Sequence, residues 1–152
     1  MSIAQRLAAA GVTLPEAPPP AASYAPWARS GNLIMTAGQI PVVDGSPMMT
    51  GILGAAVSLE EGQQAARQCA INVLAQLQAA TGDLEQLTRL VKITVFVASA
   101  ADFHSQHLVA NGASDFLGEI LGEDVGTHAR SAVGVAVLPL NVPVEVEAIA
   151  EV

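Results

Sequence analysis

Residues 142–152, VPVEVEAIAEV, change character at every second position. In an extended chain, one side of this segment carries small aliphatic residues and the other carries the carboxylates Glu145 and Glu147. A period of two residues is the period of a β-strand with one buried face, and no α-helix has it. The segment therefore predicts a strand in a sheet that has one covered face and a second face of different character.

Residues 58–82 have the features of a long helix. Ser58 and Glu61 have the spacing of a capping box, apolar residues follow at helical intervals, and Gly82 is placed to end the helix. A second helix is expected over about residues 101–121, although Gly112 and Gly118 weaken it. A short leading helix is also expected near the N-terminus.

Four further segments complete the predicted fold. RLVKITVFVAS, residues 89–99, predicts a strand with Val91 and Ile93 on one face and Leu90 and Lys92 on the other. The remaining strands are expected at 32–42, at 47–53 after an Asp-Gly turn, and at 131–138. The order β-β-α-β-α-β-β predicts an α+β domain over 1–152 with both helices on one face of the sheet.

Arg130 opens the run ARSAVGVAVLP, residues 129–139, in a chain with only six lysines and arginines. A guanidinium in apolar surroundings costs free energy unless an anion meets it, so Arg130 is a candidate anion ligand; an ordinary ion pair is the alternative. For Glu145 the alternative is a solvated residue on the outer face. If residues 131–138 and the last strand form a hairpin, Arg130 lies roughly 13 Å beyond Glu145. We therefore expect no direct pair between them, and a cleft for a small acid instead.

Composition narrows the setting. The net charge of −8 repels phosphate backbones and argues against a nucleic-acid partner. The single cysteine, Cys69, cannot form an internal disulfide, and the N-terminus makes a poor signal peptide, so we expect a cytoplasmic protein with an inert buried thiol. No apolar run reaches the ~18 residues of a membrane-spanning helix. The mean hydropathy of +0.45 predicts that apolar surface is buried between subunits.

Three blocks of the chain resemble the RidA family, also called YjgF. They are GNLIMTAGQIP at 31–41, VKITVFVASAADF at 91–103 and ARSAVGVAVLPLNVPVEVEAIA at 129–150. The third block is the most specific, because Arg-Ser, Val-x-x-Leu-Pro and Val-Glu-x-Glu-Ala-Ile-Ala follow one another in the family's order. The resemblance begins near Tyr24. Residues 1–20 extend beyond the family's usual start, and this extension indicates a divergent subgroup of the family.

The resemblance implies a homotrimer with a chorismate-mutase-like fold, in which ligand clefts lie between subunits. It implies hydrolysis of reactive enamines and imines, such as 2-aminoacrylate, to 2-keto acids and ammonia, as by a 2-iminobutanoate/2-iminopropanoate deaminase. No metal or organic cofactor is implied. Arg130 would hold the substrate carboxylate and Glu145 would position or activate the attacking water, while Tyr24 would cover the cleft and Asn111 would line it. The ribonuclease activity attached to the family fits poorly with a charge of −8.

Two positions depart from the family pattern. Ala132 stands where the family has a cysteine, and Ala37 stands where it has a serine. Both changes make the implied pocket less polar and leave the substrate open. They also keep open a second function, that of a non-catalytic binder of a small carboxylated metabolite.

The three histidines allow further interpretations. His104 and His107 have a spacing that suits a metal pair on a helix, but no third ligand is evident, and surface positions are favoured. His128, two residues before Arg130, either touches a bound anion or lies in a loop without contact to it. The loop is the favoured interpretation.

Overall fold

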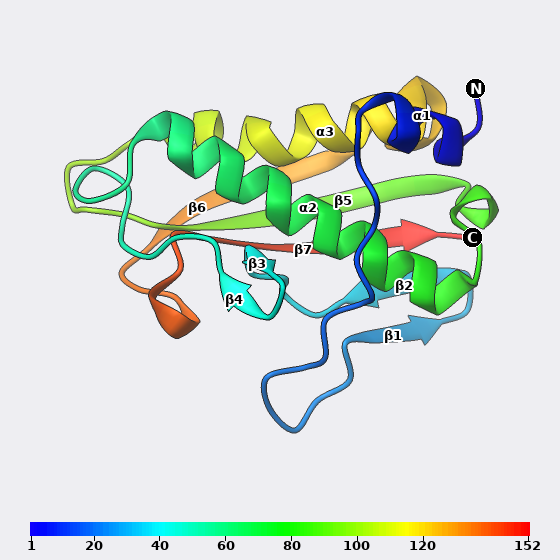
Figure 1. Ribbon diagram of the computed structural model, residues 1–152, viewed down its shortest axis with the longest axis horizontal. Helices are drawn as coiled ribbons and strands as arrows, with labels where there is room; N and C mark the ends of the chain where they lie inside the picture. Colours follow the sequence, from blue (N-terminus) through cyan, green and yellow to red (C-terminus); the bar gives the residue numbers. More distant parts are fainter.

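The computed structural model describes residues 1–152, in which helices cover one face of a mixed sheet (Figure 1). The helices are α1 (Ile3–Ala9), α2 (Leu59–Thr81) and α3 (Gln106–Gly126), with the 3-10 turns η1 (Leu84–Gln86) and η2 (Pro139–Asn141). The strands are β1 (Trp27–Ser30), β2 (Leu33–Thr36), β3 (Val42–Val43), β4 (Ser46–Pro47), β5 (Arg89–Ala98), β6 (Ala129–Val135) and β7 (Val144–Glu151). The α+β class predicted from the sequence is confirmed.

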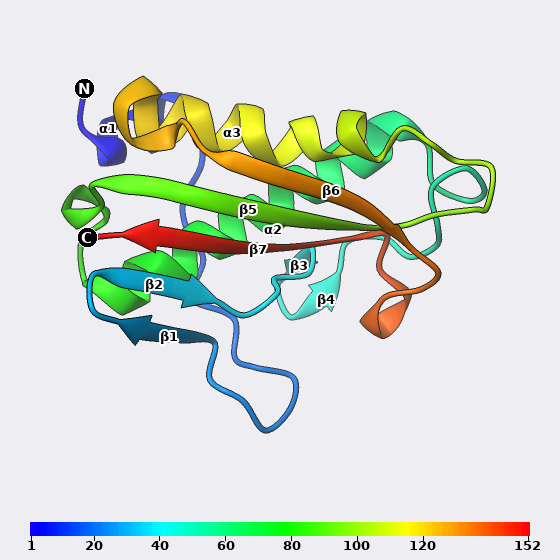
Figure 2. The ribbon, with the colours of Figure 1, turned by 180° about the vertical axis from the view of Figure 1, so that it is seen from behind.

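The main sheet has five strands in the order β1-β2-β7-β5-β6, as the view from behind shows (Figure 2). β7 lies at the centre, antiparallel to both β2 and β5, and β6 is parallel to β5 at one edge. The predicted hairpin between residues 131–138 and the last strand is therefore wrong, because β5 separates β6 from β7. The short connection that suggested a hairpin instead carries the chain past the end of β5.

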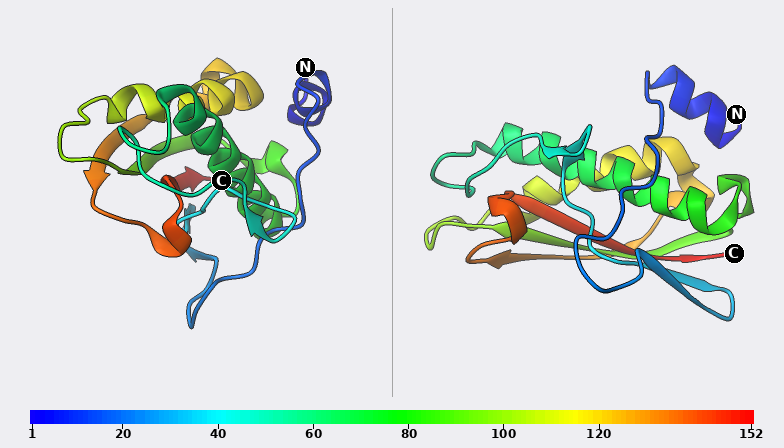
Figure 3. Two further views of the ribbon diagram at one scale, coloured as in Figure 1. Left: turned by 60° about the vertical axis from the view of Figure 1, so that its left-hand side comes forward. Right: turned by 60° about the horizontal axis from the view of Figure 1, so that its bottom comes forward.

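Helices α2 and α3 lie side by side on one face of this sheet, and no helix covers the other face (Figure 3). The predicted alternation of β7 is confirmed: Val144, Val146 and Ala148 are buried toward the helices, and Glu145 and Glu147 are half-buried on the open face. The core between the layers consists mainly of alanine, valine, leucine and isoleucine.

Strand β5 departs from its predicted faces. Its register with β7 shifts between Leu90 and Lys92, so one residue is inserted. Leu90 therefore lies on the buried face together with Ile93, and Val91 is only half-buried. A β-bulge changes which face the residues before it occupy, and alternation alone does not reveal it.

The two long helices differ in how well their ends were predicted. α2 begins after Ser58, whose hydroxyl accepts from Glu61 N while the Glu61 carboxylate accepts from Ser58 N, and it ends at Gly82 with φ +78°. Its predicted limits are confirmed. α3 begins at Gln106 and ends at Gly126, about five residues later at each end than predicted, with a break at Gly122, where φ is +81°.

The first segments also differ from the prediction. The leading helix is present as α1, and its Ile3 and Leu7 are buried against the rest of the molecule. The expected strand at 47–53 is reduced to Ser46–Pro47, while β1 at Trp27–Ser30 was not predicted. None of the helices is both long and apolar enough to span a lipid bilayer.

Candidate functional site

Arg130 lies near the start of the edge strand β6, on the face that carries the helices. Its Nη1 donates to Asn111 Oδ1 at 2.9 Å and to Ser114 Oγ at 3.1 Å, and its Nη2 donates to the His107 carbonyl at 3.1 Å. All three acceptors are neutral oxygens. The guanidinium is thus held in place without a carboxylate to balance its charge.

The three partners of Arg130 come from one face of α3. Residues 107, 111 and 114 are spaced by four and three positions, which places them one above another on a helix. A guanidinium has five N–H groups, and these contacts use three of them. The Nε–H and one Nη2–H remain, and a carboxylate bound in a bidentate manner needs two. Two N–H groups of Arg130 therefore have no hydrogen-bond partner within this chain.

Glu145 lies on the open face of the central strand β7, opposite Phe96 of β5 in the register. Burial raises the pKa of its carboxyl group, and the negative charge of Glu147 on the same face raises it further. A carboxylate in such surroundings is more basic than one in water. Glu145 can thus accept a proton from a water molecule more readily than an exposed glutamate can.

Gly38 makes room for this carboxylate. A Cβ atom at position 38 would overlap Oε1 of Glu145 and lie 2.8 Å from its Cδ. The neighbouring Gln39 fixes this turn to β7, because its N–H donates to the Val146 carbonyl at 2.7 Å and its carbonyl accepts from Val146 N at 2.9 Å. The turn is therefore tied to the strand that carries Glu145.

Two buried amide side chains of α2, Asn72 and Gln76, hold the same turn from the helix-covered face of the sheet. Asn72 Nδ2 donates to the carbonyls of Ile40 and Val42 at 2.9 and 3.1 Å. Gln76 Nε2 donates to Gln39 Oε1 at 3.3 Å, and both α2 side chains are fully buried. Buried amides at positions 72 and 76, one helical turn apart, could have indicated this role in the sequence, because such groups require partners.

Arg130 and Glu145 occupy opposite faces of the sheet in one chain. In the register of β5, Arg130 pairs with Ile93 and Glu145 with Phe96, so the two residues are two strands and three positions apart. Their Cα atoms are thus separated by about 14 Å. The expectation that the two side chains do not pair agrees with the contacts of Arg130, but the hairpin on which it rested is wrong. The expected cleft between them does not form within a single chain.

The other predicted site residues lie in different places. Asn111 contacts Arg130, and Ala132 follows Arg130 on the same side of β6, half-buried. Ala37 immediately precedes Gly38, the glycine that lies against Glu145, in the turn after β2. The Ala37 N–H donates to the Pro26 carbonyl. Tyr24 is 48% exposed in the segment before β1, where its Oη accepts from Ala21 N at 3.3 Å. Asn111 and Ala132 therefore lie with Arg130, and Ala37 lies near Glu145, whereas the hydrogen bonds of Tyr24 reach neither group.

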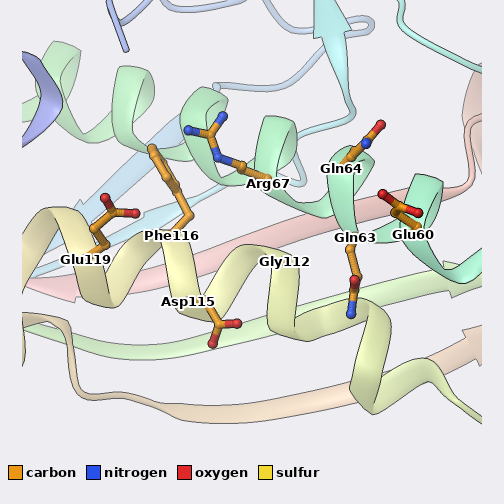
Figure 4. A pocket seen from close by; sticks show the side chains of 8 residues that line it. All are labelled: Glu60, Gln63, Gln64, Arg67, Gly112, Asp115, Phe116 and Glu119. Atoms are coloured by element: carbon orange, nitrogen blue, oxygen red, sulfur yellow. The ribbon is translucent and has the colours of Figure 1, made fainter. Parts of the chain in front are cut away.

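A groove between the two long helices contains neither group. A groove of about 330 Å³ lies between α2 and α3, and Figure 4 shows the side chains that line it: Glu60, Gln63, Gln64, Arg67, Gly112, Asp115, Phe116 and Glu119. In it the guanidinium of Arg67 lies over the ring of Phe116, 4.7 Å from the centroid. This groove faces away from the sheet and is lined by none of the predicted site residues.

Comparison with known proteins agrees with this architecture. Residues 4–152 match the model of the YjgF/chorismate-mutase-like endoribonuclease family. The chain is 48% identical to Protein TCP17 of Trypanosoma cruzi, covering 98% of this chain and 93% of that protein. It is 37% identical to the 2-iminobutanoate/2-iminopropanoate deaminase of Escherichia coli K12, covering 88% and 91% respectively.

Among solved structures, the chain resembles protein Atu1372 of Agrobacterium tumefaciens. The TM-score is 0.92 at 47% identity, covering 99% of this chain and 92% of the other. The family model and these relatives span nearly the whole chain. The chain belongs to the YjgF/RidA family.

Proposed function

We propose that this protein hydrolyses small 2-imino acids, and the enamines in equilibrium with them, to 2-keto acids and ammonia. The observation that carries the proposal is the state of Arg130, a half-buried cation with three neutral partners and two N–H groups to spare. Its planar fork matches a carboxylate, which every 2-imino acid carries. The relationship to a 2-iminobutanoate/2-iminopropanoate deaminase supports the same chemistry.

Glu145 is proposed as the group that activates water. Its carboxylate, made more basic by burial, takes a proton as the water oxygen bonds to the imine carbon. That proton passes to the nitrogen, which gives a carbinolamine. Glu145 then takes the remaining hydroxyl proton and delivers it to the amino group, so that the carbon–oxygen double bond forms as the carbon–nitrogen bond breaks and ammonia leaves. One carboxyl group can perform both transfers, so the small side chains of Ala37 and Ala132 are compatible with the reaction.

We further propose that a working site needs two copies of the chain. Arg130 and Glu145 lie on opposite faces of one sheet, so a ligand that reaches both must lie between Arg130 of one subunit and Glu145 of another. The open face of the sheet, with half-buried Phe96 and Ile149 and exposed Val133, offers an apolar surface for such contacts. A homotrimer satisfies this requirement, and the single buried Cys69 suits a reducing, cytoplasmic setting.

The test is release of keto acid and ammonia from freshly generated 2-aminoacrylate and 2-iminobutanoate, with and without the protein. Arg130→Ala should lose at least about 30-fold in kcat/KM, the equivalent of the ~2 kcal/mol at the lower end for an unpaired ligand charge. Arg130→Lys should fail to restore it, because an ammonium cannot make the bidentate contact. Arg29→Ala, in which an exposed arginine of β1 is removed, serves as the matched control. Full activity in Arg130→Ala would refute the carboxylate anchor.

A second candidate function is binding of a small carboxylate without turnover. The observation that favours it is that alanine at positions 37 and 132 provides no hydroxyl or thiol that could assist Glu145 in proton transfer. Glu145→Gln separates the two functions. If the protein is a deaminase, Glu145→Gln should keep pyruvate binding and lose turnover. If it is a non-catalytic binder, the wild-type chain itself should show no turnover.

Sedimentation tests the assembly. A trimer at micromolar concentration is the expected result. A stable monomer at that concentration would remove the site between subunits, and with it the proposed mechanism.

A further inference from the structure

His128, in the turn between α3 and β6, belongs to the hydrogen-bond network of Arg130. Its Nδ1 lies 2.6 Å from the Gly126 carbonyl, and its Nε2 lies 2.9 Å from Ser114 Oγ. A carbonyl oxygen can only accept, so the hydrogen of a neutral ring must be on Nδ1. Nε2 is then an acceptor, and the hydroxyl hydrogen of Ser114 points at it.

This arrangement determines what Ser114 can offer to Arg130. With its hydrogen directed to His128, the Ser114 oxygen presents lone pairs to Nη1 of Arg130, 3.1 Å away. Without His128, the same hydroxyl could rotate and point its hydrogen at the guanidinium, which would repel it. The three side chains therefore form an ordered chain from the Gly126 carbonyl to the guanidinium.

We propose that His128 is a positioning residue for the carboxylate anchor: acting through Ser114, it orients Arg130, and when protonated it adds a second positive charge to the anchor. This inference rests on the proposed function, since it concerns the ligand held by Arg130. It differs from the sequence-based interpretation, which favoured His128 as a loop residue without contact to the anion site.

Protonation changes the direction of one hydrogen bond without breaking the chain. The imidazolium donates from both nitrogens, and Ser114 Oγ then accepts from His128 and Arg130 together, one lone pair for each. Its own hydrogen turns away. The positive charges of His128 and Arg130 are then linked through a single oxygen, and an anion at Arg130 experiences both.

No other charged side chain shares this network. On α3, Asp115 and Glu119 line the groove toward α2, and the remaining acidic side chains, Glu123 and Asp124, line the hollow beside Arg6. The imidazole of His107 is exposed, and that residue contributes only its carbonyl. On β5, Lys92 pairs with Ala129 and belongs to the open face. On β6, Arg130 is the one charged residue, so the effect of His128 falls on the anchor.

The test is pyruvate binding measured by calorimetry between pH 5.5 and 8 at low ionic strength. Histidine side chains change charge in this range, and pyruvate stays ionised throughout it. A second positive charge in the network of Arg130 should tighten binding by the chain that keeps His128 about two- to fivefold at the acidic end. The series is run in the Glu145→Gln background, so that titration of that carboxyl does not contribute.

Three variants separate positioning from a general structural role. His128→Leu removes the acceptor for Ser114 and should bind about three- to tenfold more weakly at every pH, as expected for a disturbed hydrogen bond to a charged group. His128→Gln can accept from Ser114 through Oε1 and does not titrate, so it should restore most of that loss but show no rise at low pH. His104→Gln, at an exposed histidine outside the network, is the matched control and should keep the wild-type profile.

Two results would overturn the inference: wild-type affinity in His128→Leu, or a wild-type pH profile in His128→Gln. If the unmodified chain binds no carboxylate at any pH, the proposed function fails. The inference is then decided by nitrogen NMR of the free protein, in which the guanidinium signals of Arg130 should follow pH in the wild type but not in His128→Gln. Identical behaviour of the two proteins would refute it.

Discussion

Replacing Gly112 with alanine should destabilise the protein even though alanine is the better helix former. Gly112 lies in α3 where this helix crosses α2. A Cβ atom there would overlap the backbone oxygen of Gln63 and lie 2.7 Å from its carbonyl carbon and 2.8 Å from its Cα. Backbone cannot rotate away as a side chain can, so the two helices must move apart.

The size of the effect follows from these contacts. An ordinary contact to Cβ is 3.4–4 Å, so a separation of the helices by about 1 Å is required. Overpacking of this kind costs about 1–3 kcal/mol, and the hydrogen bond from Gln63 Nε2 to the Leu108 carbonyl, 2.9 Å long, contributes about 1 kcal/mol that is also at risk. The helix propensity of alanine returns about 1 kcal/mol. A net loss of about 2 kcal/mol is expected.

Gly118, in the same helix, is the matched control. A Cβ atom at this position would meet nothing within 4 Å, so Gly118→Ala should gain about 0.5–1 kcal/mol. Thermal and urea unfolding of both variants, at equal protein concentration, should shift in opposite directions relative to the wild type. A Gly112→Ala protein as stable as the wild type would show that the helix crossing is not as close as described.

Three further predictions concern the region around Glu145. Gly38→Ala should leave the fold intact but displace the Glu145 carboxylate, since only a flexible side-chain end obstructs the new methyl group, and NMR titration of Glu145 should detect the change. The raised pKa of Glu145 means that the folded state binds its proton more tightly than the unfolded chain, so stability should fall as the pH rises from about 4.3 through the higher native value. Glu145→Gln should abolish that part of the decline in urea unfolding, and an unchanged pH dependence would contradict it. The thiol of Cys69, fully buried, with its pKa raised well above the ordinary value by burial, should react with a thiol reagent only as fast as the protein unfolds.

Much of the fold was predictable where the cause is local. The ends of α2 follow from Ser58, Glu61 and Gly82, which act on the helix through their own backbone contacts. The buried face of β7 follows from alternation within its own sequence. Strand pairing has no such local cause, because neighbouring strands in a sheet are chosen by the packing of the whole chain. The wrong β6–β7 hairpin and the bulge at Leu90 both arise from this limit.

The candidate site shows the same division. Residue types and family resemblance were enough to name Arg130, Asn111 and Glu145 as candidates, but not to predict that Arg130 and Glu145 lie on opposite faces of the sheet. Ser114 was not identified as a partner of Arg130, nor was His128 identified as a partner of Ser114. They are fourteen positions apart, and only the return of the chain from α3 to β6 brings their side chains within 2.9 Å.

The central place of β7 has a consequence for synthesis on the ribosome. β7 hydrogen-bonds to β2 on one side and β5 on the other, so the sheet remains divided until residues 144–151 have emerged. The nascent chain therefore carries β2 and β5 with unpaired edges, and α2 and α3 without the surface that covers them. Helix α1 likewise lacks its contact with α3 at first, since Arg6 can donate to the carbonyl of Ile120 only after more than a hundred further residues are made. The sheet can therefore close only late in synthesis, and until then its unpaired strand edges are sites at which partly made chains can aggregate.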